Sequence, residues 1–169
     1  MNKCVFLDRD GVLNEDCADY VYRLADCIVP PGVVEALQQL KEAGFLLIVI
    51  TNQAGIAKGL YTRLEVLDIY NYLQKLSGNA LDAIYFCPHH PQYDTDSLRR
   101  KPDSLMIEKA IAKYHIDISQ SWMVGDAERD VLAGKKAGLR TIQITPQATS
   151  LADYIAVDLF QASEFILGS

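Results

Sequence analysis

Residues 45–50 are six consecutive apolar side chains that end in Thr51 and Asn52. A run of this kind, with no polar alternation, is typical of a strand that is covered on both faces, as in a parallel sheet. Shorter runs at 4–7 and 122–124 lead into Asp8 and into Gly125-Asp126. Because parallel strands need long crossovers, usually helices, we expect strands and helices to alternate along this chain.

Helix signals do separate the apolar runs. The first predicted helix runs from Pro30-Pro31-Gly32 to Gly44, the second from a Thr62/Glu65 capping box to about Leu76, and the third from an Asp103 cap to Tyr114. A fourth predicted helix contains Val131, Leu132 and Ala133 and stops at Gly138, and a fifth covers Ser163 to Leu167. The predicted strands cover 4–7, 45–50, 81–87, 122–124, 141–144 and 154–156, with a short extended piece around 20–22. This alternation predicts an α/β fold with a doubly wound, mainly parallel, Rossmann-like sheet in three layers. Residues 1–169 are expected to form one domain without a separate cap.

The composition of the chain limits the kinds of molecule that it is expected to bind. The formal net charge is -6 and the sequence pI is about 5.0, which argues against a nucleic acid or an anionic membrane as partner. No apolar run has the length of a membrane span, and the first residues lack the layout of a signal peptide. We therefore expect a cytoplasmic protein with reduced cysteines and a small-molecule substrate.

Polar residues stand at the predicted strand ends and in one loop: Asp8, Asp10, Thr51, Asn52, Arg100, Lys101 and Asp126. In a parallel sheet the carboxyl ends of the strands meet at one edge, so these side chains are expected to converge. Two carboxylates as close in sequence as Asp8 and Asp10 repel each other unless a cation lies nearby. The pattern therefore predicts a site for Mg²⁺, held by Asp8, Asp126 and the backbone carbonyl of Asp10.

Phosphoryl transfer accounts for these residues together. Asp8 would be the nucleophile that forms an aspartyl-phosphate, and Asp10 the acid that protonates the leaving group and then the base that activates water. Thr51 and the backbone amides near Asn52 would bind phosphate oxygens, and Lys101 would stabilise the transition state. Taken singly, each motif is also compatible with a turn, a cap or a solvated patch.

The motif set Asp8-Arg9-Asp10-Gly11, Thr51-Asn52, Lys101 and Gly125-Asp126, joined by Asp130, resembles the haloacid-dehalogenase (HAD) superfamily of phosphatases. The segments at 8–14, 51–57, 87–91 and 100–102 resemble, more narrowly, the D-glycero-D-manno-heptose-1,7-bisphosphate 7-phosphatases and the related histidinol-phosphate phosphatases. The resemblance implies that Asp16, the Gln53-Ala54 backbone, Arg100 and Ala127 lie near the substrate, and Arg100 is expected to clamp a second phosphate or a sugar hydroxyl.

One departure from that family concerns zinc. The family carries a structural zinc held by a Cys-x-His and a Cys-x-Cys pair; here Cys87 and His89 match the first pair, and the second is missing. Two such ligands do not make a closed tetrahedral site. Asp94, Asp96 or His90 could substitute, but we predict that the loop holds no zinc.

Several alternatives stay open at this point. The substrate is expected to be heptose bisphosphate, with histidinol phosphate or another small sugar phosphate as the alternative. A binding protein on a retired phosphatase fold, a dehalogenase, a phosphomutase and a phosphoacceptor domain are the rival classes. The chain is expected to be a monomer, although a neighbouring subunit could complete the wall of an open site.

Overall fold

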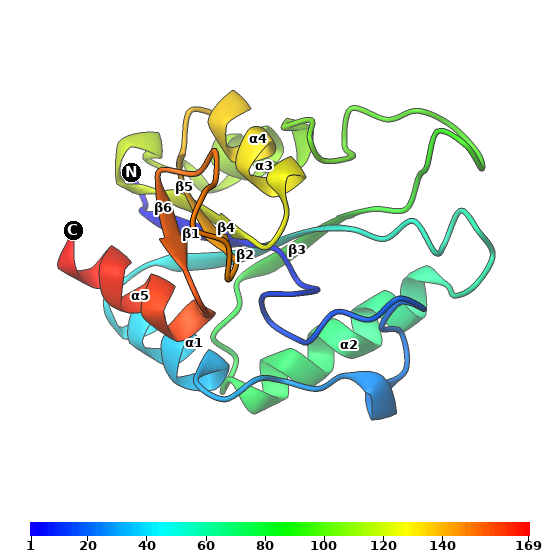
Figure 1. Ribbon diagram of the computed structural model, residues 1–169, viewed down its shortest axis with the longest axis horizontal. Helices are drawn as coiled ribbons and strands as arrows, with labels where there is room; N and C mark the ends of the chain where they lie inside the picture. Colours follow the sequence, from blue (N-terminus) through cyan, green and yellow to red (C-terminus); the bar gives the residue numbers. More distant parts are fainter.

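The computed structural model describes all 169 residues, and a six-stranded sheet runs through its middle (Figure 1). The strands are β1 (Cys4–Leu7), β2 (Leu46–Asn52), β3 (Ala83–Cys87), β4 (Trp122–Gly125), β5 (Arg140–Ile144) and β6 (Tyr154–Ala156). Their order across the sheet is β3-β2-β1-β4-β5-β6, and every neighbouring pair is parallel. The predicted doubly wound sheet is confirmed, and it is parallel throughout.

Helices cover both faces of this sheet. Helices α1 (Val33–Glu42), α2 (Arg63–Leu76) and α5 (Leu159–Gly168) lie on one side, and α3 (Leu105–Tyr114) and α4 (Glu128–Lys136) on the other (Figure 1). Two short 3-10 turns, η1 (Leu24–Asp26) and η2 (Ile118–Gln120), complete the elements. Along β1, Val5 and Leu7 pack in the larger apolar cluster while Cys4 and Phe6 pack in the other. Because successive side chains of a strand point to opposite faces, an unbroken apolar strand fills both layers.

Two of the helix ends that were predicted from local sequence signals are confirmed. The Glu65 carboxylate accepts a hydrogen bond from the Thr62 N–H at 2.7 Å, so the predicted capping box is confirmed. Gly44, which follows α1, has a φ of 84°. That left-handed conformation is accessible to glycine without steric cost, which explains why α1 ends there as predicted.

Three local predictions are wrong. Asp103 does not cap α3: Ser104 is the N-cap, and the Asp103 carboxylate binds the Lys136 ammonium at 2.8 Å instead. The last helix begins at Leu159 rather than Ser163, because the Asp158 carboxylate accepts from the Gln161 N–H and starts it earlier. Residues 20–22 form no strand, since a φ of 65° at Tyr20 breaks the extended conformation.

The strand order determines which polar ends meet. β1 lies between β2 and β4, with Leu7 level with both Val49 and Val124. The Asp8 N–H continues this ladder by donating to the Val124 carbonyl at 2.9 Å. The residues that follow β1, β2 and β4 therefore share one edge of the sheet. None of the five α-helices combines the length and apolar composition of a membrane span.

Candidate active site

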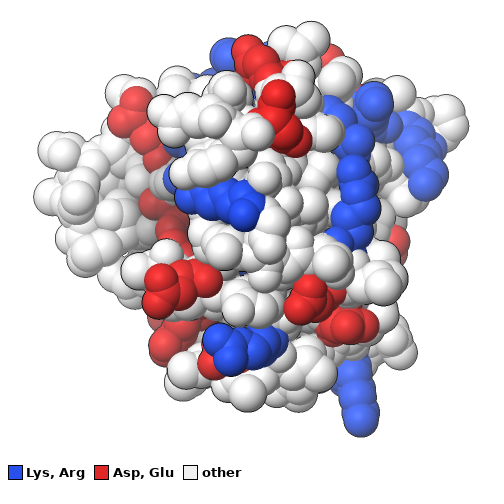
Figure 2. Space-filling model, turned by 90° about the vertical axis from the view of Figure 1, so that its right-hand side faces the viewer, with Lys and Arg blue, Asp and Glu red and all other residues white.

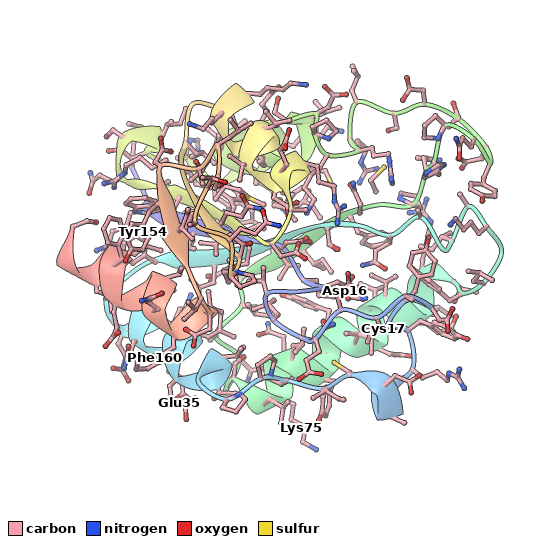
Figure 3. All side chains as sticks on the ribbon, in the orientation of Figure 1. Asp16, Cys17, Glu35, Lys75, Tyr154 and Phe160 are labelled. Atoms are coloured by element: carbon pink, nitrogen blue, oxygen red, sulfur yellow. The ribbon has the colours of Figure 1, made fainter.

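A pocket of about 280 Å³ opens at this carboxyl edge. Its lining residues come from the ends of β1 and β2, the loop after β1 and the first turn of α4: Asp8, Asp10, Asp16, Cys17, Ala18, Tyr20, Thr51, Asn52 and Arg129. Figure 3 labels Asp16 and Cys17 on the loop that follows β1. The structure thus brings five of the predicted site residues into one pocket.

Lys101 lies beneath this pocket with its ammonium fully buried between two carboxylates. Its Nζ is 2.9 Å from Asp8 Oδ1 and 2.7 Å from Asp130 Oδ1, and it donates to the Ile50 carbonyl at 2.7 Å. Burial raises the pKa of Asp8 and the Asp130 charge raises it further, while Lys101 opposes both effects. Burial disfavours the charged ammonium, but Asp130 and Asp8 outweigh it and raise the pKa of Lys101. The ammonium therefore remains a fixed positive charge beside Asp8.

The Asp10 carboxylate is surrounded by hydrogen-bond donors. Its two carboxylate oxygens accept five hydrogen bonds: three from the Arg9 guanidinium (2.7–3.0 Å), one from Asn14 and one from Gln53. Arg9 is itself buried and also donates to the Val21 carbonyl at 2.6 Å. An acceptor-only arrangement is the one that an ionised carboxylate makes. These hydrogen bonds fix the position of the Asp10 carboxylate in the pocket.

The orientation of the Gln53 amide depends on Tyr61. The Tyr61 hydroxyl donates to Gln53 Oε1 at 2.6 Å, so Gln53 Nε2 points the other way and donates to Asp10 Oδ2 and Thr51 Oγ1. The Tyr61 ring stacks on Tyr22 with a centroid distance of 5.2 Å. A chain of contacts therefore connects the loop after β1 to the carboxylate of Asp10.

Asn52 holds the Lys101 backbone. Its Oδ1 accepts from the Lys101 N–H and its Nδ2 donates to the Lys101 carbonyl, both at 3.0 Å. This pair of hydrogen bonds ties the loop of Lys101 to the end of β2. The predicted phosphate-binding role of Asn52 thus concerns its backbone, since both side-chain groups are engaged.

Asp8, Asp126 and Asp130 form the one group of three metal-ligand side chains in the structure, with ligand atoms within 4.8 Å of one another. Asp130 is committed to Lys101 and to the Ala127 N–H. Asp126 Oδ1, in contrast, is buried without a hydrogen-bond partner. Burial, followed by the Asp130 charge, raises the pKa of Asp126. Asp8 shares one ammonium with Asp130, and Asp126 keeps an oxygen without a partner, so these two carboxylates are a donor set that fits a hard divalent cation.

Close packing at Gly11 supports this arrangement. A Cβ at Gly11 would overlap the Asp126 carboxylate, and the residue has a φ of 82°. Both the space and the backbone conformation thus require glycine in the turn that follows Asp10.

Four predicted substrate-binding residues lie outside the pocket lining: Gln53, Ala54, Arg100 and Ala127. Ala54 is buried, and the Ala127 N–H is taken by Asp130 Oδ2 at 3.0 Å. Arg100 donates to the His89 carbonyl at 3.3 Å. The loop after β3 therefore uses Arg100 to hold its own backbone.

The loop 88–100 is organised around Asp94. Its carboxylate accepts from the His90 N–H (2.8 Å), the His89 ring (2.7 Å) and the Thr95 N–H (2.7 Å). The His90 N–H, followed by the His89 ring, lowers the pKa of Asp94 to about 2. Cys87 is buried, and neither it nor His89 belongs to a group of three ligand side chains. Hydrogen bonds to one carboxylate hold this part of the loop together.

Arg129 and Tyr20 line the pocket, although the sequence did not single them out. The sequence does contain a sign that Arg129 lies near the site, because it stands between Asp126 and Asp130 of the motif, in the first helical turn after Gly125-Asp126. No local pattern marks Tyr20, which reaches the pocket through the path of the loop after β1.

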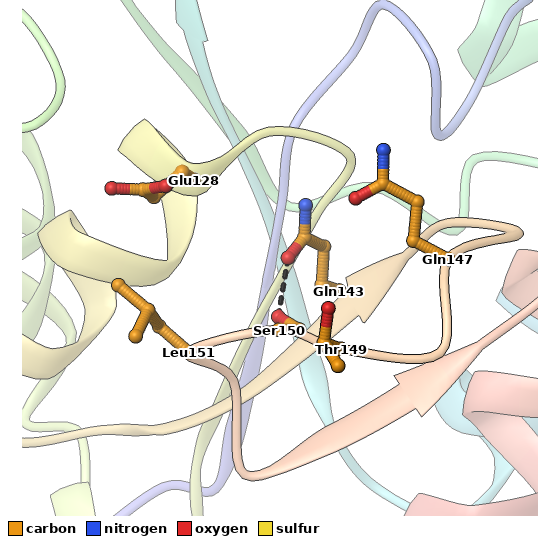
Figure 4. A pocket seen from close by; sticks show the side chains of 6 residues that line it. All are labelled: Glu128, Gln143, Gln147, Thr149, Ser150 and Leu151. Atoms are coloured by element: carbon orange, nitrogen blue, oxygen red, sulfur yellow. Dashed lines mark hydrogen bonds between the residues drawn. The ribbon is translucent and has the colours of Figure 1, made fainter.

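A second pocket, of about 360 Å³, lies beside the same sheet edge (Figure 4). Its lining is Glu128, Gln143, Gln147, Thr149, Ser150 and Leu151. Gln143 accepts from the Ser150 hydroxyl and donates to the Asp126 carbonyl at 3.0 Å. With an acid and no cation in its lining, this second pocket does not suit an anion.

Comparison with known proteins assigns the family. A HAD-hydrolase-like family model matches residues 98–162. A D-glycero-D-manno-heptose-1,7-bisphosphate 7-phosphatase from Chlorobaculum tepidum is 38% identical, with 98% of this chain and 95% of the relative covered. The chain belongs to the HAD phosphatases.

Further relatives of this HAD phosphatase carry the same kind of name. A D-glycero-beta-D-manno-heptose-1,7-bisphosphate 7-phosphatase from Haemophilus ducreyi is 42% identical over 82% of this chain and 80% of its own. The crystal structure of D,D-heptose 1,7-bisphosphate phosphatase from B. bronchiseptica, complexed with magnesium and phosphate, matches with a TM-score of 0.88. That match has 29% identity and covers 98% of both chains. The predicted superfamily, family and hydrolase class are confirmed.

Proposed function

We propose that this HAD phosphatase removes the 7-phosphate of D-glycero-D-manno-heptose 1,7-bisphosphate in a Mg²⁺-dependent reaction. The observation that carries this proposal is the buried Asp8 carboxylate, which lines the pocket and pairs with Lys101. Relatives named for this substrate, similar over nearly the whole chain, support the choice of sugar.

In the proposed reaction an oxygen of Asp8 attacks phosphorus, and the bond from phosphorus to the sugar oxygen breaks. Asp10, protonated at this stage, gives its proton to the leaving sugar oxygen. The resulting carboxylate then removes a proton from the water that attacks the aspartyl-phosphate, and inorganic phosphate leaves. The five hydrogen bonds to Asp10 support these roles, because they fix the position of its carboxyl group in the pocket.

Other side chains supply binding and charge. The Lys101 ammonium faces Asp8 and would stabilise negative charge on the transferring phosphoryl group. Asp8, Asp126 and the carbonyl of Asp10 would hold Mg²⁺, and Asp130 would keep Lys101 in place. When bound, Mg²⁺ neutralises charge on the phosphate oxygens and on the carboxylates that face them.

The test measures phosphate release with Mg²⁺ or with EDTA. The panel contains both anomers of heptose 1,7-bisphosphate, histidinol phosphate and simple sugar phosphates. We expect Mg²⁺-dependent turnover with a clear preference for one heptose anomer. Higher kcat/KM on histidinol phosphate would replace the sugar assignment, and no release from any ester would support the binding-protein alternative.

Asp8→Asn is the matched control for this experiment, because it removes the nucleophile and keeps the size of the side chain. We expect a folded protein, judged by circular dichroism, without turnover. Appreciable turnover in this variant would exclude Asp8 as the nucleophile.

A further inference from the structure

Arg129 is the one cationic residue in the lining of the pocket that contains Asp8, Asp10 and Thr51. It stands in the first turn of α4 and is exposed. The N-terminus of a helix carries partial positive charge, so a cation there opposes the helix dipole. Lys135 and Lys136, in the last turn of α4, occupy the favourable end instead. Helix stability therefore does not explain an arginine at position 129.

The Arg129 guanidinium takes part in none of the ion pairs of the structure. The Arg129 side chain makes no hydrogen bond to the protein either, although the pocket lining contains three carboxylates. Burial, followed by the Asp10 charge, raises the pKa of nearby Asp16, and the Arg129 charge opposes this rise without a direct contact. A guanidinium offers five N–H donors in a planar fork that matches a phosphate. All of these donors are open to a ligand.

The other cations around the pocket are already engaged. Arg9 and Lys101 are buried on carboxylates, and Arg100 donates to the His89 carbonyl at 3.3 Å. The Lys58 ammonium lies over the rings of Tyr20 and Tyr93, at 5.1 and 5.0 Å from their centroids. On the face at the right of Figure 1, seen in Figure 2, basic and acidic side chains are interspersed. Binding of a second anionic group therefore depends on a single well-placed cation rather than on a broad basic surface.

We propose that Arg129 binds the phosphate of the substrate that is not hydrolysed, and so selects a bisphosphate over a monophosphate. This inference rests on the proposed function, and it adds a specificity-determining residue to it. The second phosphate would enter a pocket lined by three carboxylates, where it needs a partner of opposite charge. The neighbouring pocket of Glu128 and Gln143 offers none.

The test compares heptose 1,7-bisphosphate with heptose 7-phosphate, which has the same reacting phosphate. Wild type, Arg129→Gln and Arg129→Lys are assayed with Mg²⁺. Lys135→Gln serves as control, because it removes the same charge from the far end of α4. A charge-assisted hydrogen bond corresponds to roughly a 10- to 100-fold change in affinity. We expect Arg129→Gln to raise KM for the bisphosphate by about that factor, with kcat little changed.

The monophosphate is expected to respond equally little to Arg129→Gln and Lys135→Gln. Arg129→Lys is expected to fall between wild type and Arg129→Gln, because lysine keeps the charge and loses the fork. Equal losses on both substrates, or no loss in Arg129→Gln, would overturn the proposal. A bisphosphate-specific loss in Lys58→Gln alone would place the second phosphate beside Lys58 and Tyr20 instead, and would overturn the proposal as well.

Failure of the proposed function is distinguishable from failure of the Arg129 proposal. Wild type that releases no phosphate from either heptose substrate refutes the choice of sugar. The same variants are then compared on fructose 1,6-bisphosphate and fructose 6-phosphate, and a bisphosphate-specific KM effect of Arg129→Gln still decides whether Arg129 binds a second phosphate. Wild type that hydrolyses mono- and bisphosphates with equal kcat/KM refutes the role of Arg129.

Discussion

Replacing Lys101 by methionine tests whether the buried ammonium supports the site as the structure indicates. The Lys101 side chain is 0% exposed, and its neighbours Asp8 and Asp130 are 4% and 0% exposed. Methionine fills similar space but leaves two carboxylates buried without their cation. Breaking a buried ion pair costs about 3–5 kcal/mol, a large part of the roughly 5–15 kcal/mol by which a domain is stable. We expect a loss of unfolding free energy in this range at neutral pH.

The assay is urea unfolding in EDTA, followed by circular dichroism. Burial already raises the pKa of Asp8 to about 7, and removing Lys101 raises it further. Burial also opposes the charged form of Asp130, whose pKa is held low by Lys101 and rises without it, so the folded variant binds extra protons. The destabilisation is therefore largest at neutral pH and shrinks as pH falls. Adding Asp130→Asn to Lys101→Met removes one unpaired charge, and we expect it to restore about 1 kcal/mol or more.

Lys41→Met is the matched control. Lys41 binds Asp82 at 2.6 Å, but its side chain is 38% exposed, and Asp82 also accepts from the Leu47 N–H. Exposed pairs contribute about 0–1 kcal/mol. A Lys101→Met variant no less stable than Lys41→Met would refute the reasoning from burial. In the same preparation, we expect kcat to fall by about 10²- to 10³-fold, as when other electrostatic groups are removed.

Further predictions concern the acid, its support and the loop 88–100. Asp10→Asn is expected to slow alkyl phosphates far more than activated aryl phosphates, which need no proton; equal losses would exclude Asp10 as the acid. Tyr61→Phe frees the Gln53 amide to rotate, and we expect a shifted pH profile of kcat, whereas an unchanged profile would exclude this positioning role. Asp94, whose pKa is lowered to about 2, stabilises the loop above its usual pKa near 4 and loses this effect as pH falls. Wild type and Asp94→Asn should thus differ in urea stability at about pH 6 and converge only as pH falls below about 2. Elemental analysis of protein purified without added metal is expected to find no zinc.

Much of the fold follows from patterns that are local in the chain. Unbroken apolar runs indicated buried parallel strands, and the Thr62/Glu65 box located the start of α2. The errors arose where two local signals competed. Asp103 and Ser104 are both of a type that caps helices; Ser104 occupies the N-cap position without a side-chain capping hydrogen bond, and the Asp103 carboxylate binds Lys136 on another helix.

The sequence by itself determined that Asp8, Thr51 and Asp126 stand at strand ends, because hydrophobic burial requires the runs before them to lie inside the sheet. The tertiary structure decided how side chains outside those ends are used. Arg9, of a type seldom fully buried, turns inward to hold Asp10, and Arg129 faces the pocket. Neither fact follows from periodicity. The direction of a loop or helix-end side chain depends on which distant charges and rings the strand order β3-β2-β1-β4-β5-β6 brings beside it, and those contacts exist only once the chain has folded.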